Sequence, residues 1–102
     1  MIFVVATIDL NPGTRDAYLV EFKKNVPLVL AEEGCIAYAP AIDAQSGFPT
    51  QFQTGPDSVT VIEQWASVDA LKAHAVAPHM KSYRAAVKDY VKNVELRVFD
   101  PA

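Results

Sequence analysis

Residues 2–10 form an apolar run with the two-residue period of a β-strand, and this run constrains the fold more than any other segment. The other face of the expected strand begins with Phe3 and Val5 before it turns polar. Because both faces carry apolar side chains, the strand needs cover on two sides. Asp9 interrupts the apolar run after too few residues for the run to cross a membrane. The first face is wholly apolar and holds Ile2, Val4, Ala6, Ile8 and Leu10.

The rest of the chain alternates between helical and strand patterns. Apolar residues at three- and four-residue spacing predict a helix that begins after Thr14, its N-cap, and runs to about Glu32 with a kink at Pro27. Gly34 is expected to stop this helix. Because of Pro40, the next strand should lie at a sheet edge or a bulge. The further strands are expected over residues 35–43, 58–65 and 94–99.

Two shorter helices are expected between the last two strands. Ser67 should cap the first of them, which runs to about Val76. Pro78 suits the first position of the second helix, because its missing N–H would have no partner there. The inner stripe of that helix is expected to hold Met80, Tyr83, Val87 and Tyr90 or Val91.

This order of elements predicts an α+β protein with a ferredoxin-like βαββαβ fold, in which a four-stranded antiparallel sheet carries helices on one face. A chain of 102 residues supports one core, so residues 1–102 are expected to form a single domain. The face of Phe3 and Val5 is left open. Because large exposed apolar patches mark association, a second copy of the sheet is the expected cover, which makes the protein a homodimer.

Charge and cysteine content narrow the functional classes. The formal net charge is -3 and no basic patch is present, which disfavours nucleic-acid binding. The apolar start has no cationic region and no cleavage site, so neither a signal peptide nor a membrane anchor is expected. A single cysteine, Cys35, cannot form an internal disulfide, and a reducing cytoplasm is the expected location.

The chain carries three informative stretches: EEGCIAY at 32–38, VIEQWAS at 61–67, and LKAH with APHM within 71–80. They resemble the antibiotic biosynthesis monooxygenase (ABM) family, which includes small quinol monooxygenase-like proteins. The similarity spans nearly the whole chain and is weakest at residues 44–57, which are longer than the family's usual hairpin. The resemblance implies a dimeric α+β barrel in which each subunit holds a pocket between its sheet and its helices.

The resemblance also implies a cofactor-independent monooxygenase that oxidises a small aromatic or quinol-like molecule with O2 and needs neither metal nor flavin. A base would deprotonate the substrate, and the electron-rich anion would itself reduce oxygen in a pocket that excludes water. Such a pocket needs a base, a donor aimed at the developing negative oxygen, and apolar walls.

The candidate catalytic residues are His74, Glu63 and His79. His74 shares a helix face with Ala70, so its imidazole should face the sheet and act as base or anion-holding donor. Glu63 shares a strand face with Trp65 and is expected to orient His74 by pairing with it. His79 begins a helix, where the helix dipole favours the neutral imidazole of a base. Each residue also has a structural alternative. His74 could be a core histidine whose hydrogen bonds are satisfied, Glu63 a member of a surface ion pair, and His79 an exposed residue at a helix start.

Aromatic and thioether side chains are the expected substrate-binding groups. Each also has an alternative role in core packing. The connection over residues 44–57 is long for so compact a domain, as functional lids often are, and its Phe48 and Phe52 are expected to close the pocket mouth. The expected walls and polar group of the pocket itself are Trp65, Met80, Tyr83 and Tyr38.

Other functions stay open at this point. A non-catalytic small-molecule-binding or stress-related dimer would use the same pocket without turnover, and an isomerase would use the base without oxygen. Haem-degrading relatives combine a Trp and a His, at positions that resemble Trp65 and His74, with an Asn on the first strand. Thr7 lies in that neighbourhood here and disfavours haem chemistry. No metal site is expected, because His74 and His79 are five positions apart around a proline.

Overall fold

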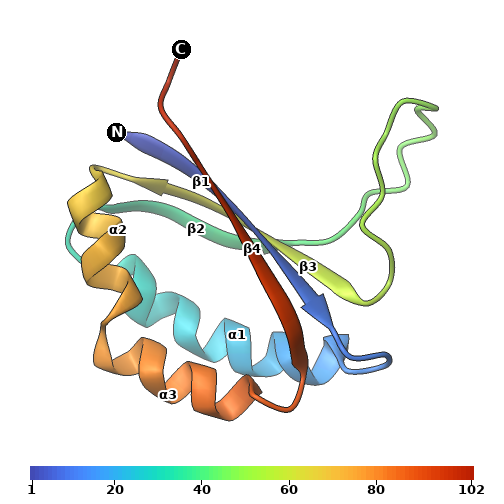
Figure 1. Cartoon of the computed structure of the whole chain (residues 1–102), viewed down its shortest axis with the longest axis horizontal. Coiled ribbons are helices and arrows are strands. Elements are labelled where there is room, and N and C mark those ends of the chain that lie inside the picture. The colour runs from blue at the N-terminus through green and yellow to red at the C-terminus, as the bar shows by residue number, and fades with distance from the viewer.

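The computed structural model describes residues 1–102 and consists of one four-stranded sheet with three helices on one of its faces (Figure 1). All strand pairs are antiparallel, and the strand order across the sheet is β2-β3-β1-β4. The predicted ferredoxin-like α+β fold is confirmed. In chain order the elements are β1 (Ile2–Leu10), α1 (Arg15–Leu30), β2 (Cys35–Ala41), β3 (Ser58–Trp65), α2 (Val68–Ala75), α3 (Pro78–Val87) and β4 (Val91–Phe99).

The alternation in β1 separates a covered face from an open face. The side chains that face the helices are all buried, whereas Phe3 on the other face is 41% exposed. Burying an aliphatic side chain of this size stabilises a fold by about 1.5–3 kcal/mol. This one strand therefore anchors the core between sheet and helices. The buried residues are Ile2, Val4, Ala6, Ile8 and Leu10.

Most of the predicted boundaries agree with the structure. α1 runs through Pro27 without interruption and ends at Leu30. The hydroxyl of Ser67 accepts a hydrogen bond from the Ala70 N–H at 3.1 Å, so it caps α2 as expected. Pro78 is the first residue of α3. β2, with its Pro40, lies at the sheet edge, and the pairing register of β2 with β3 shifts near Cys35.

The last helix is shorter than the sequence pattern predicts. α3 ends at Val87, so Tyr90 and Val91 are not part of its inner stripe, and β4 begins at Val91 rather than Val94. Asn11 explains the difference. Its backbone N–H donates to the Tyr90 carbonyl at 2.8 Å, and its side-chain amide donates to the Asp89 carbonyl at 3.0 Å. These tertiary hydrogen bonds take the carbonyl groups out of any further helical turn.

Residues 42–57 project beyond the ends of β2 and β3, away from the helices (Figure 1). Asp43 closes the base of this loop, because its carboxylate accepts hydrogen bonds from the backbone N–H groups of Thr54 at 3.0 Å and Gly55 at 2.8 Å. The same hydrogen bonds, that from Thr54 first, lower the pKa of Asp43. Asp43 thus ties the two ends of the loop together.

Two apolar surfaces are left uncovered. The open face of the sheet exposes Phe3, Ile62 and Phe99 to between 41% and 48%. On β4, Val94 and Leu96 pair with the buried Ile8 and Ala6 of β1 but are themselves 55% exposed, because the helices do not extend over this edge of the sheet. None of the helices combines the length and the apolar character needed to cross a membrane.

Candidate active site

A cavity of about 420 Å³ lies between the sheet and the helices. Thirteen of its 17 lining residues are hydrophobic, so it offers a largely apolar site to a small molecule. Glu63, His74, Arg84 and Lys88 are its charged or titratable side chains other than tyrosines. The remaining lining residues are Ala6, Ile8, Phe22, Tyr38, Val61, Leu71, Ala75, Met80, Tyr83, Val87, Val91, Val94 and Leu96.

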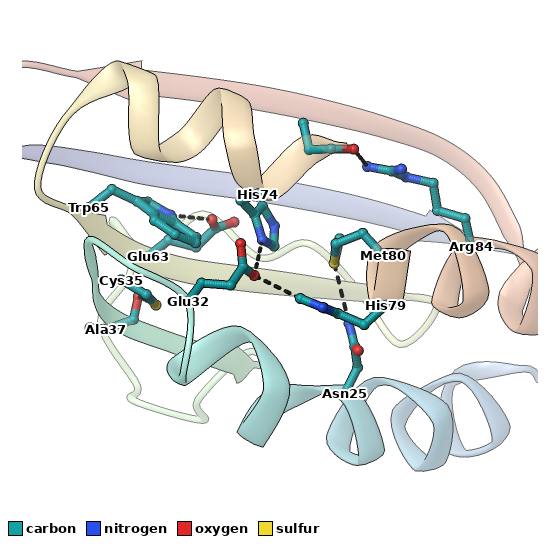
Figure 2. Close-up of polar contacts among 11 residues, drawn as sticks. Asn25, Glu32, Cys35, Ala37, Glu63, Trp65, His74, His79, Met80 and Arg84 are labelled. Atoms are coloured by element: carbon teal, nitrogen blue, oxygen red, sulfur yellow. Dashed lines mark hydrogen bonds and ion pairs between the residues drawn. The ribbon is translucent and has the colours of Figure 1, made fainter. Parts of the chain in front are cut away.

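One carboxylate holds both histidines of the chain (Figure 2). The Oε2 atom of Glu32 lies 2.7 Å from Nδ1 of His74 and 2.9 Å from Nε2 of His79. The exposed fractions of the three side chains are 7% for His74, 13% for Glu32 and 23% for His79. Because Nδ1 of His74 is engaged, its Nε2 is the ring nitrogen left to meet a molecule in the cavity.

The turn after α1 places Glu32 beside α2. Gly34 has a φ of +83°, a left-handed conformation that favours glycine, and its carbonyl accepts a hydrogen bond from the Ala66 N–H at 2.7 Å. A Cβ atom at Gly34 would lie only 2.7 Å from the Cβ atom of Ala70 on α2. The glycine therefore lets the turn approach the helix that carries His74.

Glu63 is buried in the cavity wall but does not pair with His74, so the predicted His74–Glu63 pair is wrong. Its Oε1 atom instead accepts a hydrogen bond of 2.9 Å from the indole Nε1–H of Trp65. The ring of Trp65 also packs on His74 with a centroid separation of 4.7 Å. Burial raises the pKa of Glu63, the Trp65 hydrogen bond lowers it, and the nearby Glu32 raises it. A carboxyl group in this position favours its protonated form more than an exposed one does.

The predicted wall residues separate into two groups. Tyr38, Met80 and Tyr83 line the cavity, and the Tyr38 ring meets His74 edge-on at 5.6 Å. Trp65 is fully buried and does not line the cavity, so it supports His74 and Glu63 from behind. Its expected role as a wall of the pocket is not supported by this placement.

Phe48 and Phe52 are not part of the cavity. They lie on the projecting loop and are 71% and 85% exposed. The prediction that they close the pocket mouth is wrong for the cavity of their own chain, because the loop leaves the body of the protein away from the helices (Figure 1). The open side of the cavity is instead bordered by Val94 and Leu96 of β4.

Two polar contacts join α1 to α3 behind the cavity. The hydroxyl groups of Tyr18 and Tyr83 form a short hydrogen bond, and burial is the main cause that raises the pKa of both phenols. The buried amide of Asn25 donates to Sδ of Met80 at 3.2 Å. These contacts fix two of the side chains that line the cavity, Met80 and Tyr83.

Glu32 is the site residue that sequence reasoning missed. It lies in a turn 42 positions before His74, where no helical or strand period connects it to the histidines. An acidic residue in the turn between Leu30 and Gly34 was the available signal, but such residues are common on surfaces. No group of three or more His, Cys, Asp and Glu side chains is arranged to hold a metal ion.

A largely apolar cavity under a ferredoxin-like sheet, with an imidazole held at its wall, defines a small α+β protein with an internal pocket. The chain belongs to the antibiotic biosynthesis monooxygenase family, whose sequence model matches residues 1–86.

Individual relatives agree with this assignment. The chain is 46% identical over 103 residues to a protein of Escherichia coli K12 named "Probable quinol monooxygenase YgiN", and the match covers 99% of this chain and 98% of the relative. A crystal structure of an antibiotic biosynthesis monooxygenase is similar with a TM-score of 0.81 at 21% identity, covering 100% of this chain and 99% of that one. PA3566 from Pseudomonas aeruginosa has a TM-score of 0.80 at 24% identity and covers 99% and 93%. These two structural matches show that the chain shares their fold.

Proposed function

We propose that this protein is a cofactor-independent monooxygenase that uses O2 to oxidise a small quinol-like aromatic molecule in the cavity between sheet and helices. The observation that carries the proposal is the His74 imidazole, which Glu32 holds through Nδ1 at the wall of an otherwise apolar cavity. The 46% identity to a protein named as a quinol monooxygenase supports the substrate class. The cytoplasm is the proposed location, since the single cysteine forms no disulfide.

In the proposed reaction, Nε2 of His74 removes a proton from a substrate hydroxyl group. Glu32 stabilises the resulting imidazolium by accepting the hydrogen bond of its Nδ1–H, which makes proton removal easier. The phenolate then supplies the electrons that reduce O2. One oxygen atom replaces a ring hydrogen and the other leaves as water, so that a quinol and O2 give a hydroxyquinone and H2O.

The other side chains of the cavity set the polarity around the substrate anion. Aliphatic and aromatic walls keep water away from the anion, which favours its reaction with oxygen. Glu63 lines the same cavity, and burial raises its pKa, which favours the protonated form, the form that donates a hydrogen bond to a developing negative oxygen. Tyr38 and Tyr83 are phenols at the wall whose pKa values burial raises, so they stay neutral and can also donate.

A homodimer is part of the proposal. The open face of the sheet exposes Phe3, Ile62 and Phe99, and a second copy of the same face would cover them. Large exposed apolar patches rarely persist on monomers, and twofold dimers are the commonest way to bury them.

Oxygen uptake with a panel of hydroquinones tests the function. The unsubstituted protein should consume O2, and His74→Gln should lower kcat roughly a hundred- to ten-thousand-fold with a smaller change in KM. Lys72→Gln is the matched control, because Lys72 lies exposed on the same helix and should leave kcat unchanged. A hydroquinone that raises Tm without oxygen uptake would instead support a binding protein, and anaerobic turnover would support an isomerase.

A further inference from the structure

The two histidines that share Glu32 face different compartments. His74 lines the inner cavity, whereas His79 lines a groove on the outside of the molecule between α1 and α3 and has no place in the inner cavity. The exposed fraction of the three side chains rises from His74 through Glu32 to His79, from 7% to 13% to 23%. Glu32 is therefore a bridge between a histidine of the inner cavity and a histidine of the outer groove (Figure 2).

Side chains of α1 and α3 lie between the two compartments, and one of them, Tyr83, lines both. Met80 lines the cavity and Asn25 lines the groove, and their hydrogen bond of 3.2 Å closes the space between α1 and α3. Figure 2 shows this contact beside the Glu32–His79 contact. Around His79 the groove holds Glu21 and Lys24, which form an ion pair at 3.0 Å. A positive charge on His79 would thus meet water and balanced surface charges.

We propose that Glu32 and His79 form a proton relay that moves the proton taken up by His74 out of the cavity to the surface groove. The inference rests on the proposed function, because it concerns the proton that His74 removes from the substrate. An imidazolium at the cavity wall would hold the substrate anion by direct charge pairing and oppose its loss of electrons. Moving the charge to His79 leaves a neutral donor at the anion.

The relay consists of three proton transfers. The relay starts with a carboxyl proton on Oε2 of Glu32, donated to Nε2 of His79, whose own proton lies on Nδ1. The substrate proton adds to Nε2 of His74, and the Nδ1 proton of His74 passes to Oε2 of Glu32. As Oε2 takes the proton of His74, it gives its own to Nε2 of His79, which becomes an imidazolium while Glu32 keeps one proton. When the second oxygen atom leaves as water, the same transfers run in reverse, return a proton to the cavity and restore both rings.

Histidine ¹⁵N NMR under anaerobic conditions tests the relay without turnover. When a hydroquinone binds to the unsubstituted protein at neutral pH, the ring nitrogens of His79 should shift to imidazolium values and those of His74 should stay neutral. In Glu32→Gln the amide cannot carry a proton, so the imidazolium should appear on His74. An imidazolium on His74 in the unsubstituted protein, or no change at His79, overturns the relay.

Kinetic rescue supplies the second measurement. His79→Gln should lower kcat at least about ten-fold with little change in KM, and small imidazole or amine buffers of different shapes should restore kcat in proportion to their concentration. Ser82→Ala, which changes the same groove without touching Glu32, should behave like the unsubstituted protein. A loss that no buffer restores, or no loss, contradicts the relay. Oxygen uptake by the unsubstituted protein tests the proposed function separately, so the two failures are distinguishable.

Discussion

Trp65 donates its indole N–H to the carboxylate of Glu63, two residues earlier on the same strand, across 2.9 Å. Residues two apart on a strand share a face, so β3 supplies both members of the pair without help from any other element. The indole ring is fully buried and also packs on His74. One side chain thus supports both polar groups of the cavity wall.

Trp65→Phe should therefore destabilise the protein by about 2–4 kcal/mol, because it removes buried ring volume and leaves a buried carboxylate without its donor. Urea unfolding measures the change. A double-mutant cycle with Glu63→Leu isolates the hydrogen bond, since Trp65→Phe should cost less when the carboxylate is absent. Equal costs in both backgrounds would mean that packing alone accounts for the loss.

Glu63 should also make stability depend on pH. Burial raises its pKa above the ordinary value of 4.5. A group whose pKa is higher in the folded chain favours folding below its unfolded pKa, and this contribution is lost as the pH rises through the folded pKa. The free energy of unfolding should therefore fall above pH 4.5 more steeply in the unsubstituted protein than in Glu63→Gln. Parallel stability curves from urea unfolding over this pH range would contradict the expectation.

The fold could be predicted from sequence because its signals are local. The alternation of residues 58–65 gave β3 its bounds, and Ser67 and Pro78 marked the starts of two helices at their own positions. The prediction was wrong after Val87, where the helical period continues but hydrogen bonds from Asn11 end the helix. Those bonds join Asn11 to Asp89 and Tyr90, 78 and 79 positions away, and no local pattern reports them.

The site was less predictable because its polar pairs depend on orientation. Sequence placed His74 and Glu63 at the same cavity, and both line it. It could not show that the indole N–H of Trp65 would donate a hydrogen bond to Glu63, or that Nδ1 of His74 would contact Glu32. Loop length likewise suggested a lid at Phe48, although the direction in which the loop leaves the sheet decides that question.

A side chain at Gly34 should destabilise the protein more than one at Gly13. Both Gly34 and Gly13 have a positive φ, of +83° and +79°, but a Cβ atom would meet Ala70 at 2.7 Å in the first case and nothing within 4 Å in the second. Gly13→Ala should cost about 1 kcal/mol from backbone strain alone. Gly34→Ala should cost about 1–3 kcal/mol more, because the turn must move away from α2. Thermal unfolding of both variants separates the cost of backbone strain from the cost of the contact with Ala70. Equal losses of stability would show that this contact adds no cost.

The Tyr18–Tyr83 hydroxyl pair should be strongly coupled. Tyr18 is fully buried, so Tyr83→Phe leaves its hydroxyl group without a partner and should cost about 1–3 kcal/mol. Tyr18→Phe together with Tyr83→Phe should cost less than the sum of the single changes, because no unpaired group remains. Chemical denaturation of the four proteins gives the coupling energy. Additive losses would mean that the hydrogen bond contributes little.

The open sheet face should be the contact surface of the proposed homodimer. Ile62 pairs with Val5 of β1, near the middle of this face, and is 48% exposed in the single chain. Ile62→Glu should convert the dimer to a monomer, because a carboxylate would be buried against apolar side chains without a partner. Phe52→Ser, on the projecting loop, is the control and should stay dimeric even though it removes a side chain that is 85% exposed. Sedimentation velocity over a dilution series measures both. A monomeric unsubstituted protein, or a dimer that survives Ile62→Glu, would leave Phe3 and its neighbours without the proposed cover.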